Sequence, residues 1–177
     1  MTTSQKPQIP QPVSEKNLDI YGHPAIPWSR ALEQLQQDKG ISPTHWLATV
    51  NPDGKPHVMA VWAVWLDGTF CFLSGASTRK GKNLARSPYV VITVASKGID
   101  LVLEGEAVKV TDEAKLQRIA NEYAAQGWQP TVREGAFYAD YGAPSAGTPP
   151  WDVYEVKLTT AFGIGREEPN GATRWSF

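Results

Sequence analysis

Short apolar runs separated by turn signals occupy residues 45–110, and this pattern constrains the fold more than any other feature. HWLATV is followed by NPDG, KPHVMAVWAVWL by DG, and YVVITVA by SKG. Asn, Pro, Asp and Gly between runs of β-branched and aromatic residues are typical of hairpin connections. Because each hairpin places a strand beside the preceding one, the sequence predicts an antiparallel β-meander.

The individual runs differ in which faces they bury. In IDLVLEGEAVKV, Leu101, Leu103, Gly105 and Ala107 alternate with more polar positions, which predicts a strand with one solvated face. HVMAVWAVW does not alternate, so we expect it to be buried on both faces. One face would meet the core and the other a ligand or a partner.

Helical patterns flank the strands. Trp28, Ala31, Leu32 and Leu35 follow helical spacing up to Gly40. A second helix is expected after Thr111-Asp112, where an apolar stripe that includes Tyr123 ends at Gly127. Residues 142–150 read as a loop, 151–164 as a long strand and 172–177 as a tail. Residues 1–24 are polar and proline-dotted, which predicts a mobile arm before a single domain at 25–177.

Roughly six strands with few helices predict a mainly β fold, a small antiparallel barrel flanked by helices. The net charge of −1 gives no global attraction to nucleic acid or membrane. No apolar run approaches the roughly 18 residues of a spanning helix, so we expect a cytoplasmic protein without a membrane partner. Seven tryptophans are many for 177 residues, and some are expected in a pocket or an interface.

The segment STRKGKNL concentrates positive charge at a helix start. Ser77 or Thr78 is a suitable N-cap, Pro88 marks the helix end, and Arg79, Lys80, Lys82 and Arg86 lie between them. One interpretation of this segment is a solvated cationic face. The alternative is a phosphate site, because hydroxyls, cations and the N–H groups of a helix start all attract anions. The segment is not a Walker loop, since the spacing is one residue too long and Asn83 replaces the metal-binding hydroxyl.

Acid–base and metal chemistry have few candidates. We interpret His57 as a residue at the edge of a strand, and His23 and His45 are isolated in the sequence. Cys71 is predicted to be a small core residue. No metal-ligand spacing and no nucleophile elbow is found, so no catalytic side chain is assigned. Tyr138 and Tyr141 could lie near a substrate or simply pack. This shortage suits hydride transfer, in which a cofactor supplies the chemistry.

Three motifs together carry a family resemblance: DGKPHVMAVWAVWLDG, FLSGASTRKGKNLARSPYVVITV and LEGEAVKVTD, with TRWSF at the C-terminus. The chain resembles the pyridoxamine 5'-phosphate oxidase-like split-barrel superfamily, which binds flavins and deazaflavins. It is most similar to the type that uses coenzyme F420. The resemblance implies a homodimer of six-stranded split barrels, with two cofactors at the subunit interface.

The resemblance also implies cofactor-binding residues. Those matching the phosphate-gripping segment are Ser74, Ser77, Thr78, Arg79, Lys80 and Asn83. Those matching the strand along the cofactor ring are Val58, Met59, Ala60, Val61 and Trp62. The terminal segment would reach a pocket through Arg174 and Trp175, and Lys82 and Arg86 are candidates for the anionic tail of F420. The full set of basic residues that holds a vitamin phosphate is not found.

The expected function is therefore hydride transfer from reduced F420 to a small unsaturated or conjugated organic molecule. The same fold carrying FMN is the first alternative, and a non-catalytic flavin or haem binder is the second. A nucleic-acid-binding barrel is disfavoured because the basic residues concentrate in one short segment. We also expect a dimer interface of roughly 2,000 Å² or more across Val58–Trp65, because a monomer rarely leaves so large an apolar strip exposed.

Overall fold

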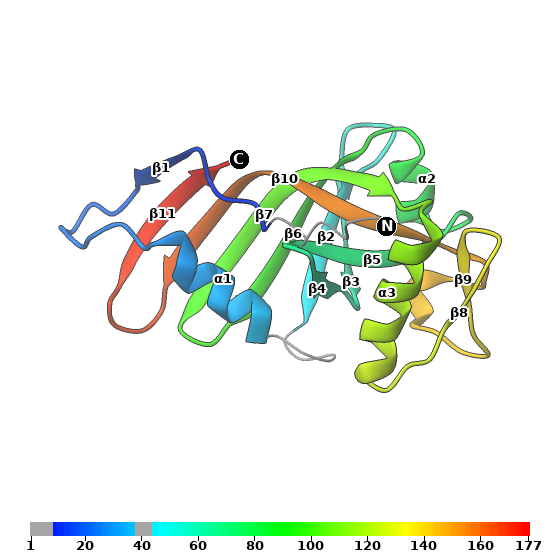
Figure 1. Cartoon of the computed structure of the whole chain (residues 1–177). Coiled ribbons are helices and arrows are strands. Elements are labelled where there is room, and N and C mark those ends of the chain that lie inside the picture. The colour runs from blue at the N-terminus through cyan, green and yellow to red at the C-terminus, as the bar shows by residue number, and fades with distance from the viewer. Residues whose placement is uncertain (1–8, 38–43) are drawn as a thin grey trace.

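The computed structural model describes residues 9–37 and 44–177, and this part of the chain forms one antiparallel sheet with helices packed around it (Figure 1). The main path through the sheet runs β1-β11-β10-β7-β6-β2-β3, and the other strands branch from it. The strands are β1 (Ser14–Asn17), β2 (His45–Val50), β3 (Pro56–Val61), β4 (Val64–Leu66), β5 (Thr69–Gly75), β6 (Tyr89–Ser96), β7 (Ile99–Lys109), β8 (Thr131–Arg133), β9 (Ala136–Tyr138), β10 (Trp151–Gly165) and β11 (Gly171–Ser176).

Three helices and one short turn of 3₁₀ helix complete the described part of the chain. They are α1 (Trp28–Gln37), α2 (Arg79–Leu84), α3 (Glu113–Ala125) and η1 (Pro144–Ala146). In Figure 1, α1 lies near β11 and β7, whereas α2 and α3 lie at the other end of the sheet. None of the helices in the described ranges is long and apolar enough to cross a bilayer.

Strand β10 joins the two halves of the fold. Its first five residues pair with β5, and its remainder pairs with β7 and β11. The register with β7 shifts between Leu158 and Thr160, and such a bulge bends a strand and increases its twist. Because β1 and β3 are the two ends of the main path, the barrel is not closed by hydrogen bonds.

Two hydrophobic clusters fill the molecule. The first packs α1 against the main sheet and contains Trp28, Leu103 and Trp175. The second packs α3 against β5, β9 and β10 and contains Tyr123 and Trp151. The candidate site described below lies on the side of this second cluster.

The fold class predicted from the sequence is confirmed: the chain is mainly β, antiparallel and a split barrel. The three helices occur where capping and periodicity placed them. Thr78 caps α2, and Asp112 caps α3 by accepting a hydrogen bond from the Lys115 backbone N–H at 2.7 Å. In β7, Leu101, Leu103 and the other alternating positions are buried as expected.

Several strands differ from the sequence-based expectation. KPHVMAVWAVWL forms two strands, β3 and β4, with a break at Trp62-Ala63. The expected tail is strand β11, in which alternate residues face the core, and the hairpin β8–β9 was not predicted. Within the expected arm, Ser14–Asn17 pairs with β11 as strand β1. Gly40, the expected end of α1, lies outside the described residues.

Candidate functional site

A tight hydrogen-bonded turn connects β5 to α2. The Thr78 hydroxyl donates to the Gly75 carbonyl at 2.8 Å, accepts from the Gly81 backbone N–H at 3.0 Å, and lies 2.9 Å from the Ser74 hydroxyl. Gly81 packs so closely that a Cβ there would lie 2.3 Å from the Gly75 carbonyl oxygen. Glycine is therefore required at this position, and the start of α2 is fixed on the end of β5.

Lys80 points into the protein. Its side chain is 2% exposed, and its ammonium group donates a hydrogen bond to the backbone carbonyl of Ser145 in η1. Burial lowers the pKa of Lys80 from 10.5 to about 8. The Ser145 hydroxyl in turn donates to the Ala60 carbonyl in β3 at 3.0 Å. Lys80 thus anchors the loop around η1 against the predicted cofactor strand.

Asn83 is also buried and bonded within the chain. Its side-chain amide donates to the Thr49 hydroxyl at 3.0 Å and to the Asn51 side-chain carbonyl at 3.2 Å. These bonds join α2 to the end of β2 and the turn that follows it. Ser74, Thr78, Lys80 and Asn83 therefore shape the segment through bonds within the chain.

The remaining polar residues of this segment are open to solvent. Ser77, Arg79, Lys82 and Arg86 are exposed. Arg79 borders a surface cavity of about 370 Å³ together with Asn51, Pro52 and Asp53. The Ser77 hydroxyl and the Arg79 guanidinium, with Lys82 in the helix and Arg86 just after its end, fit a phosphate ester, because Arg offers paired donors to phosphate oxygens.

Strand β3 leaves part of its apolar surface open. It pairs with β2 on one side and is the free edge of the main path on the other. Val58 and Met59 are 50% and 37% exposed, whereas Val61 is buried. Beyond the strand, Trp65 packs in the core against Phe70. The sequence predicts that a ligand or a partner covers this stretch. Such a cover is needed for Val58 and Met59, but not for Trp65, which the core already buries.

Arg174 and Trp175 lie apart from the phosphate segment in this chain. Trp175 is fully buried in the first hydrophobic cluster, with its ring 5.3 Å from that of Trp28. Arg174 is exposed on β11, at the end of the sheet opposite α2 (Figure 1). A single chain does not bring these two residues to Arg79.

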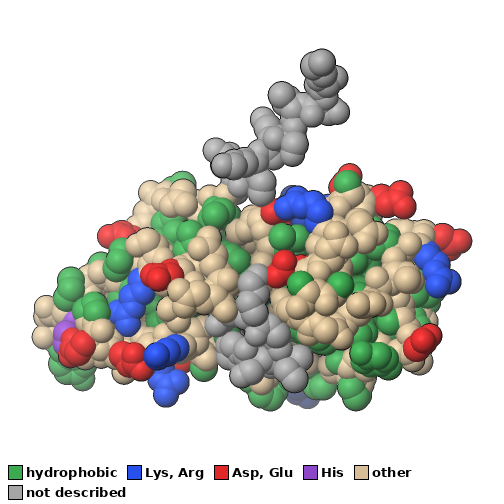
Figure 2. Space-filling view, turned by 60° about the horizontal axis from the view of Figure 1, so that its bottom comes forward, with side chains coloured by type: hydrophobic (Ala, Val, Ile, Leu, Met, Phe, Trp, Pro, Cys, Tyr) green, Lys and Arg blue, Asp and Glu red, His purple; other side chains and the backbone are tan. Residues whose placement is uncertain are grey.

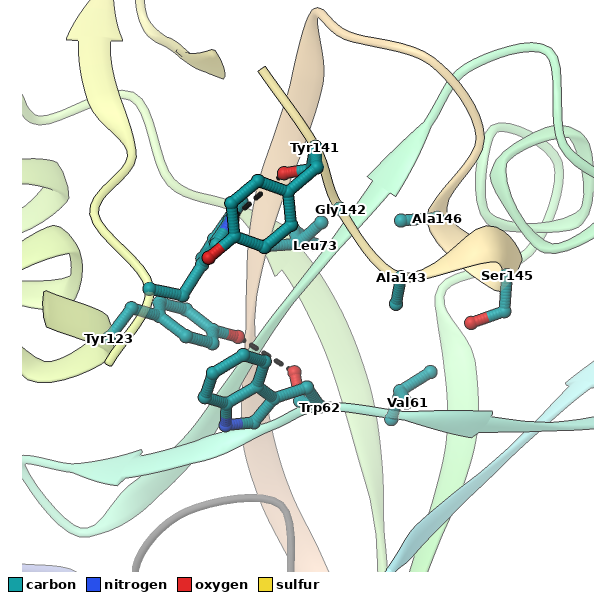
Figure 3. Close-up of a pocket in the computed structure, with 10 residues that line it drawn as sticks. Val61, Trp62, Leu73, Tyr123, Tyr141, Gly142, Ala143, Ser145 and Ala146 are labelled. Carbon is teal, nitrogen blue, oxygen red and sulfur yellow. Dashed lines mark hydrogen bonds between the residues drawn. The ribbon is translucent and has the colours of Figure 1, made fainter. Parts of the chain in front are cut away.

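An aromatic pocket of about 240 Å³ lies beside the end of β3 (Figure 3). We use this name for the cavity lined by Val61, Trp62, Leu73, Tyr123, Trp128, Tyr141, Gly142, Ala143, Ser145 and Ala146. Of these residues, Val61 and Trp62 are the two that the sequence predicts as cofactor-binding residues, and Tyr141 is a residue for which the sequence allows either a place near a substrate or packing. The abundance of tryptophan is the one sequence signal that pointed to such a pocket.

The split barrel, with a cavity beside the β5–α2 turn, places the chain among the antiparallel split-barrel proteins. The family model described as pyridoxamine 5'-phosphate oxidase matches residues 32–162. The chain belongs to this family and has the split-barrel fold of its oxidoreductases.

Comparisons with individual proteins agree with this membership. A pyridoxine/pyridoxamine 5'-phosphate oxidase of Bacteroides thetaiotaomicron is 32% identical over 90 residues, which cover 49% of this chain and 42% of that protein. The matched part is thus less than half the length of that relative.

Solved structures agree on the fold. General stress protein 26 of Bacillus anthracis superposes with a TM-score of 0.54 at 17% identity, covering 77% of this chain and 93% of its own. A heme binding protein of Mycobacterium smegmatis superposes with a TM-score of 0.56 at 18% identity, covering 78% and 54%. At these identities the likeness concerns the fold alone.

Proposed function

We propose that this protein is an oxidoreductase that binds the reduced deazaflavin coenzyme F420 and passes a hydride to a small unsaturated or conjugated molecule. The observation that carries the proposal is the row of exposed cations at α2. Arg79 and Ser77 would hold one phosphate, and Lys82 and Arg86 add positive charge along the same segment. F420 continues beyond its phosphate into an anionic tail, whereas FMN ends there.

The residues of the chain would bind, orient and shield, because the cofactor supplies the transferable hydride. Arg79 and Ser77 would hold the phosphate, and the backbone of Val58–Trp62 would flank the ring. The aromatic pocket beside Trp62 would exclude water from the reacting face. No described residue is assigned as a proton donor.

FMN in the same site is the alternative, since the phosphate contacts would be shared. A non-catalytic binder would hold a chromophore without turnover. A nucleic-acid surface is less consistent with the charge distribution: on the face in Figure 2, described Lys and Arg side chains are interspersed with Asp and Glu. A continuous basic strip is the expected footprint of such binding.

The first test is to purify the protein from a host that makes both cofactors and to identify the bound molecule by absorbance and mass. We expect F420. Stoichiometric FMN, with no measurable affinity for F420, would overturn the assignment of the cofactor.

The second test is the Arg79→Ala variant. Loss of a charge-assisted phosphate contact should raise the Kd for F420 by about tenfold or more. Arg166→Ala is the matched control, because Arg166 is an exposed arginine after β10, at the end of the sheet opposite α2. An unchanged Kd in Arg79→Ala would indicate that the exposed cations are solvated surface residues and not a phosphate site.

A further inference from the structure

The aromatic pocket is uncharged. None of the described residues that line it carries a Lys, Arg, His, Asp or Glu side chain. A charged group entering the pocket would lose its hydration without gaining a counter-charge, which is strongly unfavourable. The chemistry of the lining therefore selects against phosphates, carboxylates and ammonium groups.

The polar ends of three of the four lining aromatic residues, those of Trp62, Tyr123 and Trp128, are already bonded within the chain. The Trp62 indole N–H donates to the Gln126 side-chain carbonyl at 3.0 Å, and the Tyr123 hydroxyl donates to the Trp62 carbonyl at 2.8 Å. The Trp128 indole N–H donates to the Tyr141 carbonyl at 2.8 Å. These side chains consequently offer a ligand mainly their ring surfaces (Figure 3).

The size and shape of the pocket suit a flat ring system. Engineered cavities of about 150 Å³ hold one benzene molecule, so about 240 Å³ accommodates one or two rings. The Trp62 ring meets the Tyr123 ring edge-on, with centroids 5.5 Å apart and planes at 81°. Rings at such angles offer a planar ligand both face and edge contacts.

The outer wall of the pocket is held in place before any ligand arrives. Ala143, Ser145 and Ala146 form this wall, and Lys80 fixes it through the Ser145 carbonyl. The Ser145 hydroxyl fixes the same loop to β3 through the Ala60 carbonyl. A preformed pocket avoids the ordering cost of binding.

We propose that the aromatic pocket binds a flat, uncharged molecule of one or two aromatic or conjugated rings. The further statement that this molecule is the substrate rests on the proposed function, because Val61 and Trp62 belong to both the pocket and the predicted cofactor strand. The proposal that the cofactor-free chain binds such a molecule in this pocket does not rest on the proposed function.

The test uses two probes that share one ring system, 2-methoxynaphthalene and 2-naphthyl phosphate. Binding to the cofactor-free chain is followed by ligand-observed NMR. We expect the neutral probe to bind at least about tenfold more tightly than the phosphate. No binding of the neutral probe, or equal binding of the two probes, would overturn the proposal.

A blocking variant locates the binding. Ala143 is exposed, lines the pocket and has an extended backbone that accepts a larger side chain, so Ala143→Phe should fill the mouth without disturbing the core. Ala125→Phe is the control, an exposed alanine of α3 outside the pocket. We expect Ala143→Phe to weaken the neutral probe about tenfold and Ala125→Phe to leave it unchanged. Equal effects would place the probe elsewhere.

Repeating the binding experiment with cofactor present distinguishes a failure of the pocket proposal from a failure of the proposed function. If the probe and F420 bind together, the pocket and its substrate role both stand. If they compete, the pocket belongs to the cofactor ring and the substrate role is wrong. If the neutral probe binds but neither F420 nor FMN does, the pocket stands and the proposed function falls.

Discussion

At the scale of single residues, neighbours in the sequence have opposite roles. Arg79 is exposed, whereas Lys80 is buried and bonded to Ser145. Successive residues of a helix point in directions about 100° apart, so one of them faces solvent while the next faces the η1 loop. The cationic segment is therefore divided between a solvent-exposed arginine and a buried structural anchor.

His45 should make the protein sensitive to acid. It is 3% exposed, its Nε2 has no hydrogen-bond partner among the described residues, and burial lowers its pKa from 6.5 to about 4. Because the unfolded chain binds the proton more readily, this group's contribution to stability is intact above pH 6.5. It should fall progressively between pH 6.5 and 4, by about 3 kcal/mol in total.

Denaturant unfolding across this pH range measures the effect. His45→Phe should flatten the pH dependence in that window. A wild-type slope retained in His45→Phe would assign the acid sensitivity to other groups.

At the scale of elements, α2 shows how a helix of six residues is held in place. It is too short to be stable by itself, so its position depends on the Thr78 cap, the Asn83 side-chain bonds and the close contact of Gly81 with β5. The exposed side of the helix is thus positioned by contacts on its buried side.

Gly81→Ala should disrupt the packing of α2 against the end of β5. The added Cβ would meet the backbone oxygen of Gly75, which cannot move without shifting β5, and overpacking of this kind costs about 1–3 kcal/mol. Thermal unfolding should show a lower Tm than wild type. Lys82→Ala, at an exposed position on the same helix, should melt close to wild type. Equal melting of both variants would contradict the close contact.

At the scale of the whole molecule, one chain leaves an apolar surface open on β2, β3 and β6. Trp46, Val58 and Tyr89 are 49%, 50% and 63% exposed. Patches of this kind usually mark interaction sites. A second copy related by a two-fold axis would cover them and would bring the edge strand β3 and the cofactor segment to the interface.

Light scattering at micromolar concentration should give about twice the mass of one chain, with or without cofactor. Val58→Glu should shift the protein toward the monomer, because a charge would be buried in the interface. Ile164→Glu is the control, since Ile164 is 55% exposed and lies near the far end of β10. If the wild-type protein is a monomer, the predicted dimer and the predicted position of the site at its interface are both wrong.

The local features of the fold were predictable from the sequence. The hairpin turns, the Thr78 and Asp112 caps and the alternation of β7 depend on interactions within a few residues, and they appear where the sequence placed them. Arg79 is exposed, and its predicted contact with a phosphate stays a prediction.

Only the tertiary structure decided which side chains meet. Lys80 and Ser145 are 65 residues apart, as the Trp62 and Gln126 side chains are 64 apart, and the packing of the second hydrophobic cluster joins both pairs. Trp175 is a core residue because β11 pairs with β10 and turns the indole toward Trp28. Local sequence signals carry no information about such contacts, because their energy arises only when distant segments pack together.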